Sequence, residues 1–155
     1  MTLSIKRLGP DDEAILGLLA AEDADFDLDG RSGPLPPLEP AAAHRYLTNP
    51  AVLHWVAVEG ERIAGFLYCL LVPLRSGAGQ ELLLYEIGVR RAYRRRGTGR
   101  ALLTHLEEWM RASGVEVVWV LADNEIAVEF YRGCGFASED PQPMYMIREL
   151  SERVP

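Results

Sequence analysis

One short stretch of this chain concentrates its positive charge. Residues 90–100 hold six of the sixteen Lys and Arg residues and no acid, in a protein of net charge −7. The apolar segment Leu82–Val89 precedes this stretch, and a helical apolar pattern follows it. Glycine at a strand-to-helix junction lets backbone amides face a ligand, and a helix N-terminus attracts anions. The spacing Arg94-x-x-Gly97-x-Gly99 therefore predicts a pyrophosphate site, with further arginines for additional phosphate charge.

The phosphate interpretation depends on position more than on the glycine spacing. The stretch has neither the Gly-Lys-Ser/Thr ending of a P-loop nor the three glycines of a Rossmann fingerprint. An exposed basic helix start is the alternative. The placement between an apolar strand and an amphipathic helix favours a phosphate site.

Glu86 is the only charged side chain in the segment Leu82–Val89. Strand alternation predicts that it shares a face with Leu84 and Gly88. Burial would raise its pKa, which suits a general base. A carboxylate that only binds substrate, or only supports the structure, is the alternative. Gly88 suits a β-bulge or the close approach of a ligand.

A second pattern lies further along the chain. Asn124, Ala127, Phe130 and Tyr131 recur at helical spacing and are followed by Gly135-Phe136. Together the two patterns resemble the acyl-CoA-binding core of the GNAT superfamily of N-acetyltransferases. The resemblance implies acetyl-CoA as cosubstrate, with its pyrophosphate at the arginine-glycine turn and its pantetheine beside the second helix. It implies these cofactor-binding residues: Ile87, Gly88, Val89, Arg94, Arg95, Arg96, Gly97, Thr98, Gly99, Arg100, Asn124, Ala127, Phe130 and Tyr131.

The same resemblance implies catalytic roles. A backbone amide near Val89 would stabilise the oxyanion that forms on the thioester. Tyr131 would be the general acid that protonates the leaving thiolate, since a phenol titrates near 10 and a thiol near 8.5. Packing beside Phe130 is the alternative for Tyr131. With Glu86, it completes the expected catalytic pair.

Acidic side chains dominate the rest of the chain. Between Asp11 and Asp29 there are eight carboxylates and no Lys or Arg. Such a surface repels nucleic acid and anionic lipid and attracts a polycation. We expect the acceptor to be a polyamine-like small molecule, with no nucleic acid or membrane partner. The acceptor-binding candidates are Glu22, Asp23, Asp25, Asp27, Glu86 and Asp123.

Three further stretches narrow the acceptor. The sequence resembles the small aminoglycoside 3-N-acetyltransferases at residues 84–89, at the triple-arginine turn and at residues 118–123. The resemblance implies acetylation of an aminoglycoside at the 3-N position, and hence antibiotic resistance. Two alternatives stay open. One is acetylation of a protein N-terminus, a lysine or a polyamine, and the other is a CoA-binding regulatory module without turnover.

These residues need a framework of strands and helices to position them. At 155 residues we expect a single acyltransferase domain spanning residues 1–155. The resemblance implies an α/β fold of GNAT type: a mixed, largely antiparallel central sheet with a parallel splayed pair and helices on both faces. Gly60-Glu61-Arg62 predicts an antiparallel hairpin. Apolar runs predict strands at Val115–Leu121 and Met144–Leu150.

The remaining residue types predict little further chemistry. His44, His54 and His105 are isolated and have no metal-ligand spacing, so we expect packing or surface roles and no bound metal. The two cysteines form no disulfide framework, and the N-terminus lacks a signal-peptide pattern, which together suit the cytoplasm. A homodimer is compatible with the resemblance.

Overall fold

The protein is described by a computed structural model that covers all residues except 1, 27, 29–30, 32, 78 and 152–155. The chain divides into two compact units, Met1–Val120 and Leu121–Pro155. The first unit contains, in order, β1 Leu3–Arg7, α1 Glu13–Ala21, the 3-10 helix η1 Asp23–Phe26, α2 Pro40–Thr48, β2 Val52–Glu59, β3 Arg62–Pro73, β4 Gln80–Val89, the 3-10 helix η2 Arg91–Tyr93, α3 Thr98–Ser113 and β5 Val118–Val120. The second unit contains α4, Glu125–Gly133.

The first unit is built on a sheet with strand order β1-β2-β3-β4-β5. Neighbouring strands are antiparallel except β4 and β5, which are parallel. The predicted hairpin is confirmed: β2 ends at Glu59, β3 begins at Arg62, and Gly60 takes the positive φ of 64° that the turn needs. The predicted mixed sheet with a parallel pair is likewise confirmed.

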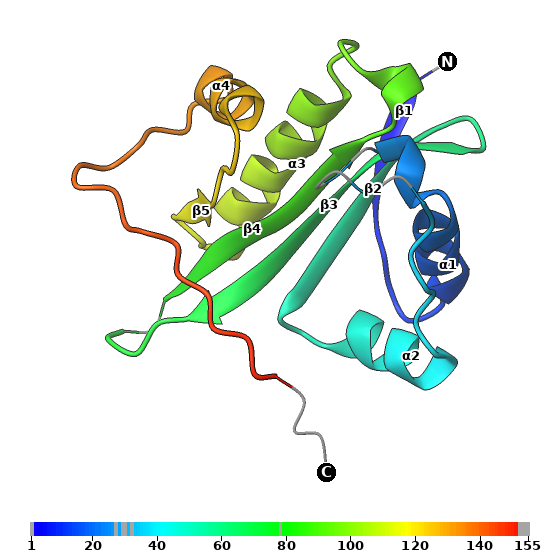
Figure 1. The fold of residues 1–155 in the computed structure, drawn as a ribbon, viewed down its shortest axis with the longest axis horizontal. Coiled ribbons are helices and arrows are strands. Elements are labelled where there is room, and N and C mark those ends of the chain that lie inside the picture. The colour runs from blue at the N-terminus through cyan, green and yellow to red at the C-terminus, as the bar shows by residue number, and fades with distance from the viewer. Residues whose placement is uncertain (1, 27, 29–30, 32, 78, 152–155) are drawn as a thin grey trace. The chain divides into compact units, whose positions relative to one another are not determined.

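Helices cover both faces of this sheet, as predicted (Figure 1). On one face, α3 packs its buried Leu102 and Leu106 toward the sheet, and the Trp55 and Trp109 rings meet edge to face at 5.9 Å. On the other face, Phe26 and Phe66 form a core cluster with the apolar side of α1. The two faces of the sheet therefore have separate apolar contacts.

A β-bulge changes the direction of side chains midway along β4. Glu86 lies opposite Tyr68, but the next pair joins Leu84 to Cys69, so Tyr85 is an extra residue on β4. Because Tyr68 and Cys69 point to opposite faces, Glu86 and Leu84 do too. The predicted alternation was therefore wrong for Leu84. It missed the bulge, which a period of two cannot reveal.

Gly88 is not the bulge that the sequence suggested. It lies opposite Phe66 in regular register, and a Cβ atom added there would come within 2.5 Å of the Phe66 ring. Close packing of an aromatic ring, rather than a bulge, requires glycine at this position.

Two strand predictions need correction. β5 is confined to Val118–Val120 instead of Val115–Leu121. The predicted strand Met144–Leu150 is wrong, because this segment has no regular secondary structure and joins no described strand. Pro141 and Pro143 precede it and lack the N–H donors of a ladder, and apolar content alone cannot supply a partner edge.

In the second unit, α4 starts at an Asn cap. The Asn124 side chain accepts a hydrogen bond from the Ala127 amide at 2.8 Å. After the helix, Gly135 takes a φ of 94°, and the ring of Tyr131 contacts those of Phe130 and Phe136. The helix cap at Asn124 and the ring contacts of Tyr131 thus give the spacing of this motif a local structural reason. Among the described residues, no helix has the length and apolarity to cross a membrane.

Candidate functional site

The turn before α3 has the geometry of an anion site. Gly97 caps the helix in the left-handed conformation, with φ 83°, and Arg95 also has a positive φ of 58°. Thr98 and Gly99 are buried at the start of a 16-residue helix. The first amides of a helix have no partner within it, and they carry partial positive charge. This turn therefore offers backbone donors to a phosphate group.

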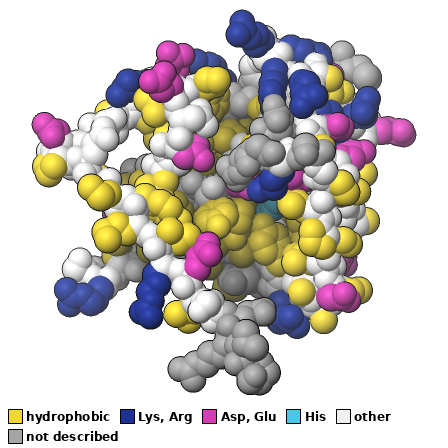
Figure 2. Space-filling view, viewed as in Figure 1, with side chains coloured by type: hydrophobic (Ala, Val, Ile, Leu, Met, Phe, Trp, Pro, Cys, Tyr) yellow, Lys and Arg dark blue, Asp and Glu magenta, His cyan; other side chains and the backbone are white. Residues whose placement is uncertain are grey.

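The arginines of this turn differ in their surroundings. Arg94 donates to the backbone oxygens of Phe26, at 2.8 Å, and Val89, at 3.2 Å. Arg96 pairs with Glu59 at 3.1 Å. Both hold the turn to the sheet, and the side chains of Arg95 and Arg100 are exposed. Figure 2 shows Lys and Arg side chains gathered at the top of the view, the end where Figure 1 places this turn.

The end of β4 has an edge without a strand beside it in the described residues of the first unit. Its pairing with β5 stops at Leu84 and Val120, whereas β4 continues to Val89. The backbone of Ile87, Gly88 and Val89 lies in this continuation. An extended chain of amides, such as pantetheine, is the kind of group that such an edge can pair. β5 is therefore paired with β4 along its whole length, and β4 extends past it by five residues, Tyr85–Val89.

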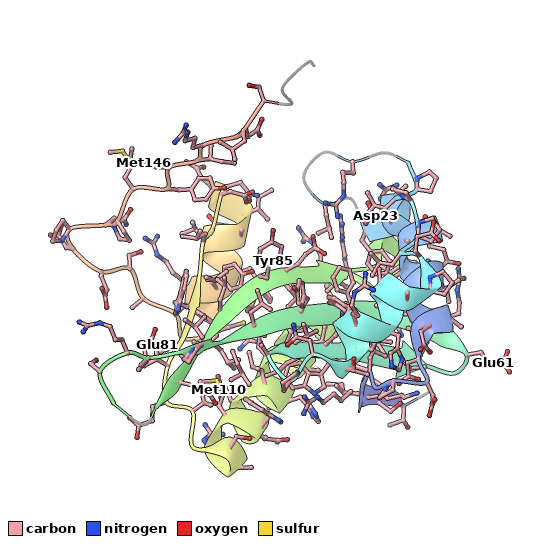
Figure 3. The ribbon with its side chains drawn as sticks, turned by 90° about the horizontal axis from the view of Figure 1, so that it is seen from below. Asp23, Glu61, Glu81, Tyr85, Met110 and Met146 are labelled. Atoms are coloured by element: carbon pink, nitrogen blue, oxygen red, sulfur yellow. The ribbon has the colours of Figure 1, made fainter. Side chains whose placement is uncertain are left out.

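Glu86 lies on the face of the sheet that α1 and α2 cover. It stands opposite Tyr68, next to Tyr85, and its side chain is 29% exposed. The rings of Tyr68 and Tyr85 lie 5.3 Å apart, and Figure 3 shows Tyr85 on the opposite side of the sheet from Met110 of α3. Glu86 is thus a partly exposed carboxylate beside aromatic rings.

Arg31 joins Glu86 to the short helix η1. Its guanidinium donates to both Asp23 oxygens, at 2.8 and 3.1 Å, and lies 3.5 Å from Glu86 Oε2. Asp23 is only 4% exposed, so its charge is supported by this bidentate pair. The hydrogen bond to Asp23, with the charge of Glu86, raises the pKa of Arg31 above its usual value. The sequence analysis missed Arg31, since a single arginine between unlike residues gives no pattern.

Arg90 belongs in sequence to the basic stretch but serves another purpose. It is 3% exposed and donates to the Ile63 backbone oxygen at 2.8 Å. It also pairs with Asp25 at 2.6 Å and with Glu22, and it lies over the Phe26 ring at 5.1 Å. Arg90 therefore fixes the acidic turn at η1 to the sheet. In the sequence, the position of Arg90 directly after a buried strand was the feature that could have indicated this structural role.

The proposed acceptor-binding acids are not equivalent. Glu22 and Asp25 pair with Arg90, and Asp23 pairs with Arg31. Asp27 lies outside the described residues. Asp123 belongs to the second unit, where it accepts a hydrogen bond from the Asn124 side chain at 3.1 Å. Part of the negative charge that the sequence displays is thus neutralised inside the fold.

A buried polar group lies on the same face as Glu86. Tyr46 of α2 and His54 Nδ1 are 2.8 Å apart, and the His54 and Tyr68 rings are stacked at 5.8 Å. Burial lowers the pKa of His54 to about 4, so the ring is neutral at pH 7. Burial likewise raises the pKa of both Tyr46 and Tyr68. His54 has a packing role, and His44 is mostly exposed, as expected for these histidines.

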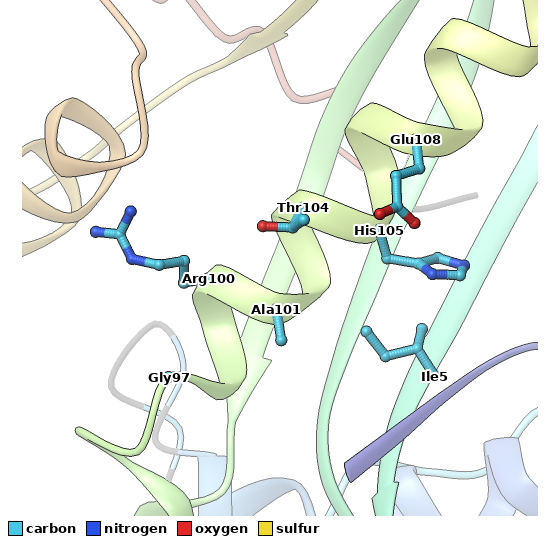
Figure 4. A pocket seen from close by; sticks show the side chains of 7 residues that line it. All are labelled: Ile5, Gly97, Arg100, Ala101, Thr104, His105 and Glu108. Atoms are coloured by element: carbon cyan, nitrogen blue, oxygen red, sulfur yellow. The ribbon is translucent and has the colours of Figure 1, made fainter.

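A shallow groove runs along α3 on the other face of the sheet (Figure 4). It begins at the phosphate-binding candidates Gly97 and Arg100 and continues past Thr104 and His105 to Glu108. The groove and Glu86 therefore lie on opposite faces of the sheet. Across the described residues, no group of three or more His, Cys, Asp or Glu side chains is arranged to hold a metal ion.

Comparison with known proteins identifies the class. The family model for the acetyltransferase (GNAT) family matches residues 18–136, and the chain belongs to this family. In sequence, it is 36% identical over 100 residues to the N-alpha-acetyltransferase RimI of Mycobacterium tuberculosis, covering 64% of this chain and 61% of that protein. It is also 41% identical over 58 residues to the [ribosomal protein bS18]-alanine N-acetyltransferase of Escherichia coli K12, covering 36% of this chain and 39% of that protein.

Solved structures give a second set of relatives. An aminoglycoside acetyltransferase from an uncultured soil metagenomic sample superposes with a TM-score of 0.82 at 27% identity, covering 97% of this chain and all of that one. Another such enzyme from soil, solved with sisomicin, has a TM-score of 0.81 at 23% identity, covering 96% and 97% of the two chains. The latter likeness shows the fold alone.

Proposed function

We propose that this protein transfers an acetyl group from acetyl-CoA to a primary amine of a polycationic small molecule, most favourably an aminoglycoside at its 3-N position. The observation that carries the proposal is Glu86, a carboxylate that is partly exposed beside Tyr68 and Tyr85 on the face opposite α3. Membership of the acetyltransferase (GNAT) family supports the use of acetyl-CoA. The likeness over the full length of a soil aminoglycoside acetyltransferase supports the acceptor class.

Acetyl-CoA supplies the activated thioester, and the first unit has groups that suit its polar parts. The amides at Gly97, Thr98 and Gly99 would hold the pyrophosphate, with Arg95 and Arg100 adding positive charge. The β4 backbone at Ile87–Val89 would pair with the pantetheine amides, and an amide near Val89 would stabilise the developing oxyanion. Asn124, Ala127 and Phe130 keep the cofactor role that the family resemblance implies.

Glu86 would begin the chemistry. Its carboxylate takes a proton from the acceptor ammonium, directly or through water, and leaves a neutral amine that can attack the thioester carbon. The amine nitrogen would add to the carbonyl carbon, and the C–S bond would break as the carbonyl re-forms. Tyr131 would donate the proton that the departing thiolate receives. The second proton that the nitrogen loses would return to Tyr131 after Tyr131 has protonated the thiolate. Glu22, Asp23, Asp25, Asp27 and Asp123 would supply negative potential that attracts the polycation.

A protein N-terminus is the second candidate acceptor, favoured by the sequence identity to the RimI-type enzymes. The two acceptors differ in charge, since an aminoglycoside carries several ammonium groups and an N-terminus one. Binding of the former should weaken much more steeply with added salt. Free Cys69 and Cys134 are compatible with a reducing cytoplasm, where we propose the protein acts.

Glu86→Gln tests the base role. We expect kcat at pH 7 to fall by more than about tenfold, as removal of a general base predicts, with the KM for acetyl-CoA unchanged. Glu81→Gln is the matched control, because Glu81 lies near the other end of β4. An unchanged kcat would leave Glu86 as a binding residue. Tight CoA binding without turnover of any amine would favour a regulatory module instead.

A further inference from the structure

We propose that Arg31 is an internal cation that competes with the acceptor's ammonium group for Glu86, and so sets acceptor affinity. The inference rests on the proposed function, in which the acceptor approaches Glu86 as a cation. No sequence pattern singles out Arg31, yet its guanidinium lies beside Glu86, where the ammonium group of the acceptor would be expected.

Arg31 bridges Asp23 and Glu86, and the geometry allows an incoming cation to replace it at Glu86. Arg31 holds Asp23 through two hydrogen bonds of 2.8 and 3.1 Å, whereas its hydrogen bond to Glu86 Oε2 is longer, at 3.5 Å. The Asp23 side chain is 6% exposed, so loss of its cation would leave a buried charge without that compensation. The Glu86 side chain is 29% exposed and can be solvated. An incoming ammonium group would therefore displace Arg31 from Glu86 and not from Asp23.

Four described groups with titratable side chains near Glu86, namely Tyr46, Tyr68, Tyr85 and His54, differ from Arg31 in carrying no positive charge at pH 7. Tyr46 and Tyr68 both interact electrostatically with Glu86, and they stay neutral at pH 7 because burial raises the pKa of each. Tyr85 is a largely exposed phenol, and His54 is neutral since burial lowers its pKa to about 4. Asp23 is the other charged group of the bridge, and its charge is already neutralised by Arg31.

Arg31 would therefore have two opposing effects. In the free protein it keeps Glu86 ionised and oriented, since a nearby cation favours the carboxylate form. During binding it repels each positive charge of the acceptor, and this cost grows with the number of acceptor charges. Removing the guanidinium should strengthen the binding of a polycation more than that of a monocation.

Calorimetric titration without acetyl-CoA measures this directly, at low ionic strength, with sisomicin as polycation and glycinamide as monocation. We expect Arg31→Gln to bind sisomicin about tenfold more tightly than the wild type, the effect of removing one partly screened cation. The gain for glycinamide should be smaller. Arg31→Gln/Asp23→Asn, which removes both charges of the buried pair, keeps part of the gain if Arg31→Gln alone folds poorly. Arg111→Gln is the control, since Arg111 pairs with Glu107 at the surface of α3.

A pH profile gives an independent readout. With the positive charge of Arg31 removed, Glu86 should protonate at higher pH than in the wild type, so the acidic limb of kcat/KM moves upward in Arg31→Gln. Equal or weaker sisomicin binding by the folded variants would overturn the proposal, as would the absence of binding by wild type and variants alike. The calorimetry needs no turnover. If the wild type acetylates amines and Arg31→Gln shows no gain, the proposed function stands and this inference fails.

Discussion

Replacing Arg90 with Met should weaken both the fold and the acceptor site. The Arg90 side chain connects the end of β4 to the acidic turn at η1, through Glu22 and Asp25, and to the backbone of Ile63. Met retains much of the apolar volume and removes the charge. The turn that carries Asp23 then loses one of its connections to the sheet, while those through Arg31 and Arg94 remain. We expect lower stability and a raised KM for the acceptor, with little change in the KM for acetyl-CoA.

The expected loss of stability is dominated by the buried part of the interaction. Leaving the Ile63 carbonyl without its donor costs about 1–3 kcal/mol. The stacking on Phe26 contributes about 1 kcal/mol. The carboxylates of Glu22 and Asp25 are 35% and 55% exposed, so water compensates them and each ion pair adds under about 1 kcal/mol. The free energy of unfolding should fall by about 3 kcal/mol, lowering Tm by about 10 °C.

Urea unfolding, followed by the fluorescence of buried Trp55, measures this quantity. Arg111→Met is the matched control, because Arg111 is 74% exposed in its ion pair with Glu107. It should change stability by less than about 0.5 kcal/mol. A change of that small size in Arg90→Met would refute the reasoning. A lower stability with an unchanged acceptor KM would separate the turn from the acceptor site.

Two further predictions concern the core. His54 has a pKa of about 4 in the folded protein against an ordinary 6.5, so the unfolded chain takes up the proton first as pH falls. The free energy of unfolding should therefore drop by about 1.4 kcal/mol per pH unit between pH 6.5 and 4. Urea unfolding at several pH values measures this pH dependence, which His54→Leu should lose and the control His44→Leu should retain. Equal slopes for His54→Leu and the wild type would contradict the prediction. Gly88→Ala should destabilise the protein by about 1–3 kcal/mol, because the added methyl group clashes with the Phe66 ring. Gly17→Ala, in open space on α1, should instead stabilise the protein by up to about 1 kcal/mol. Calorimetric melting of both variants checks that the two changes in stability have opposite signs.

Local patterns in the sequence predicted most of the first unit. The hairpin at Gly60 was predictable because its turn needs a left-handed conformation that few residues other than glycine adopt, and Gly114 ends α3 in the same conformation, with φ 71°. The bulge at Tyr85 did not follow, because it depends on how β4 pairs with β3 and not on the residues of β4 alone. The strand predicted at Met144–Leu150 was wrong for a similar reason, as an apolar run specifies no pairing partner.

In the candidate site, the backbone turn before α3 was predictable from the sequence, and the ion pairs of the acidic turn were not. The glycine spacing led to the left-handed turn at Gly97 before α3. Counting carboxylates between Asp11 and Asp29 suggested an open acidic surface. The structure neutralises part of that surface with Arg31 and Arg90, which lie 8 or more residues from their partners along the chain. Such pairings follow from the folded arrangement, which a count of charges does not include.

Acetylation of sisomicin and of a peptide with an N-terminal alanine, measured side by side, tests the central claim most directly. Each would be incubated with the protein and acetyl-CoA at low ionic strength, and both thiol release and the acetylated product would be followed. We predict steady acetylation of sisomicin at one amine, lost in Glu86→Gln, and negligible acetylation of the peptide. Acetylation of the peptide with none of sisomicin would contradict the account.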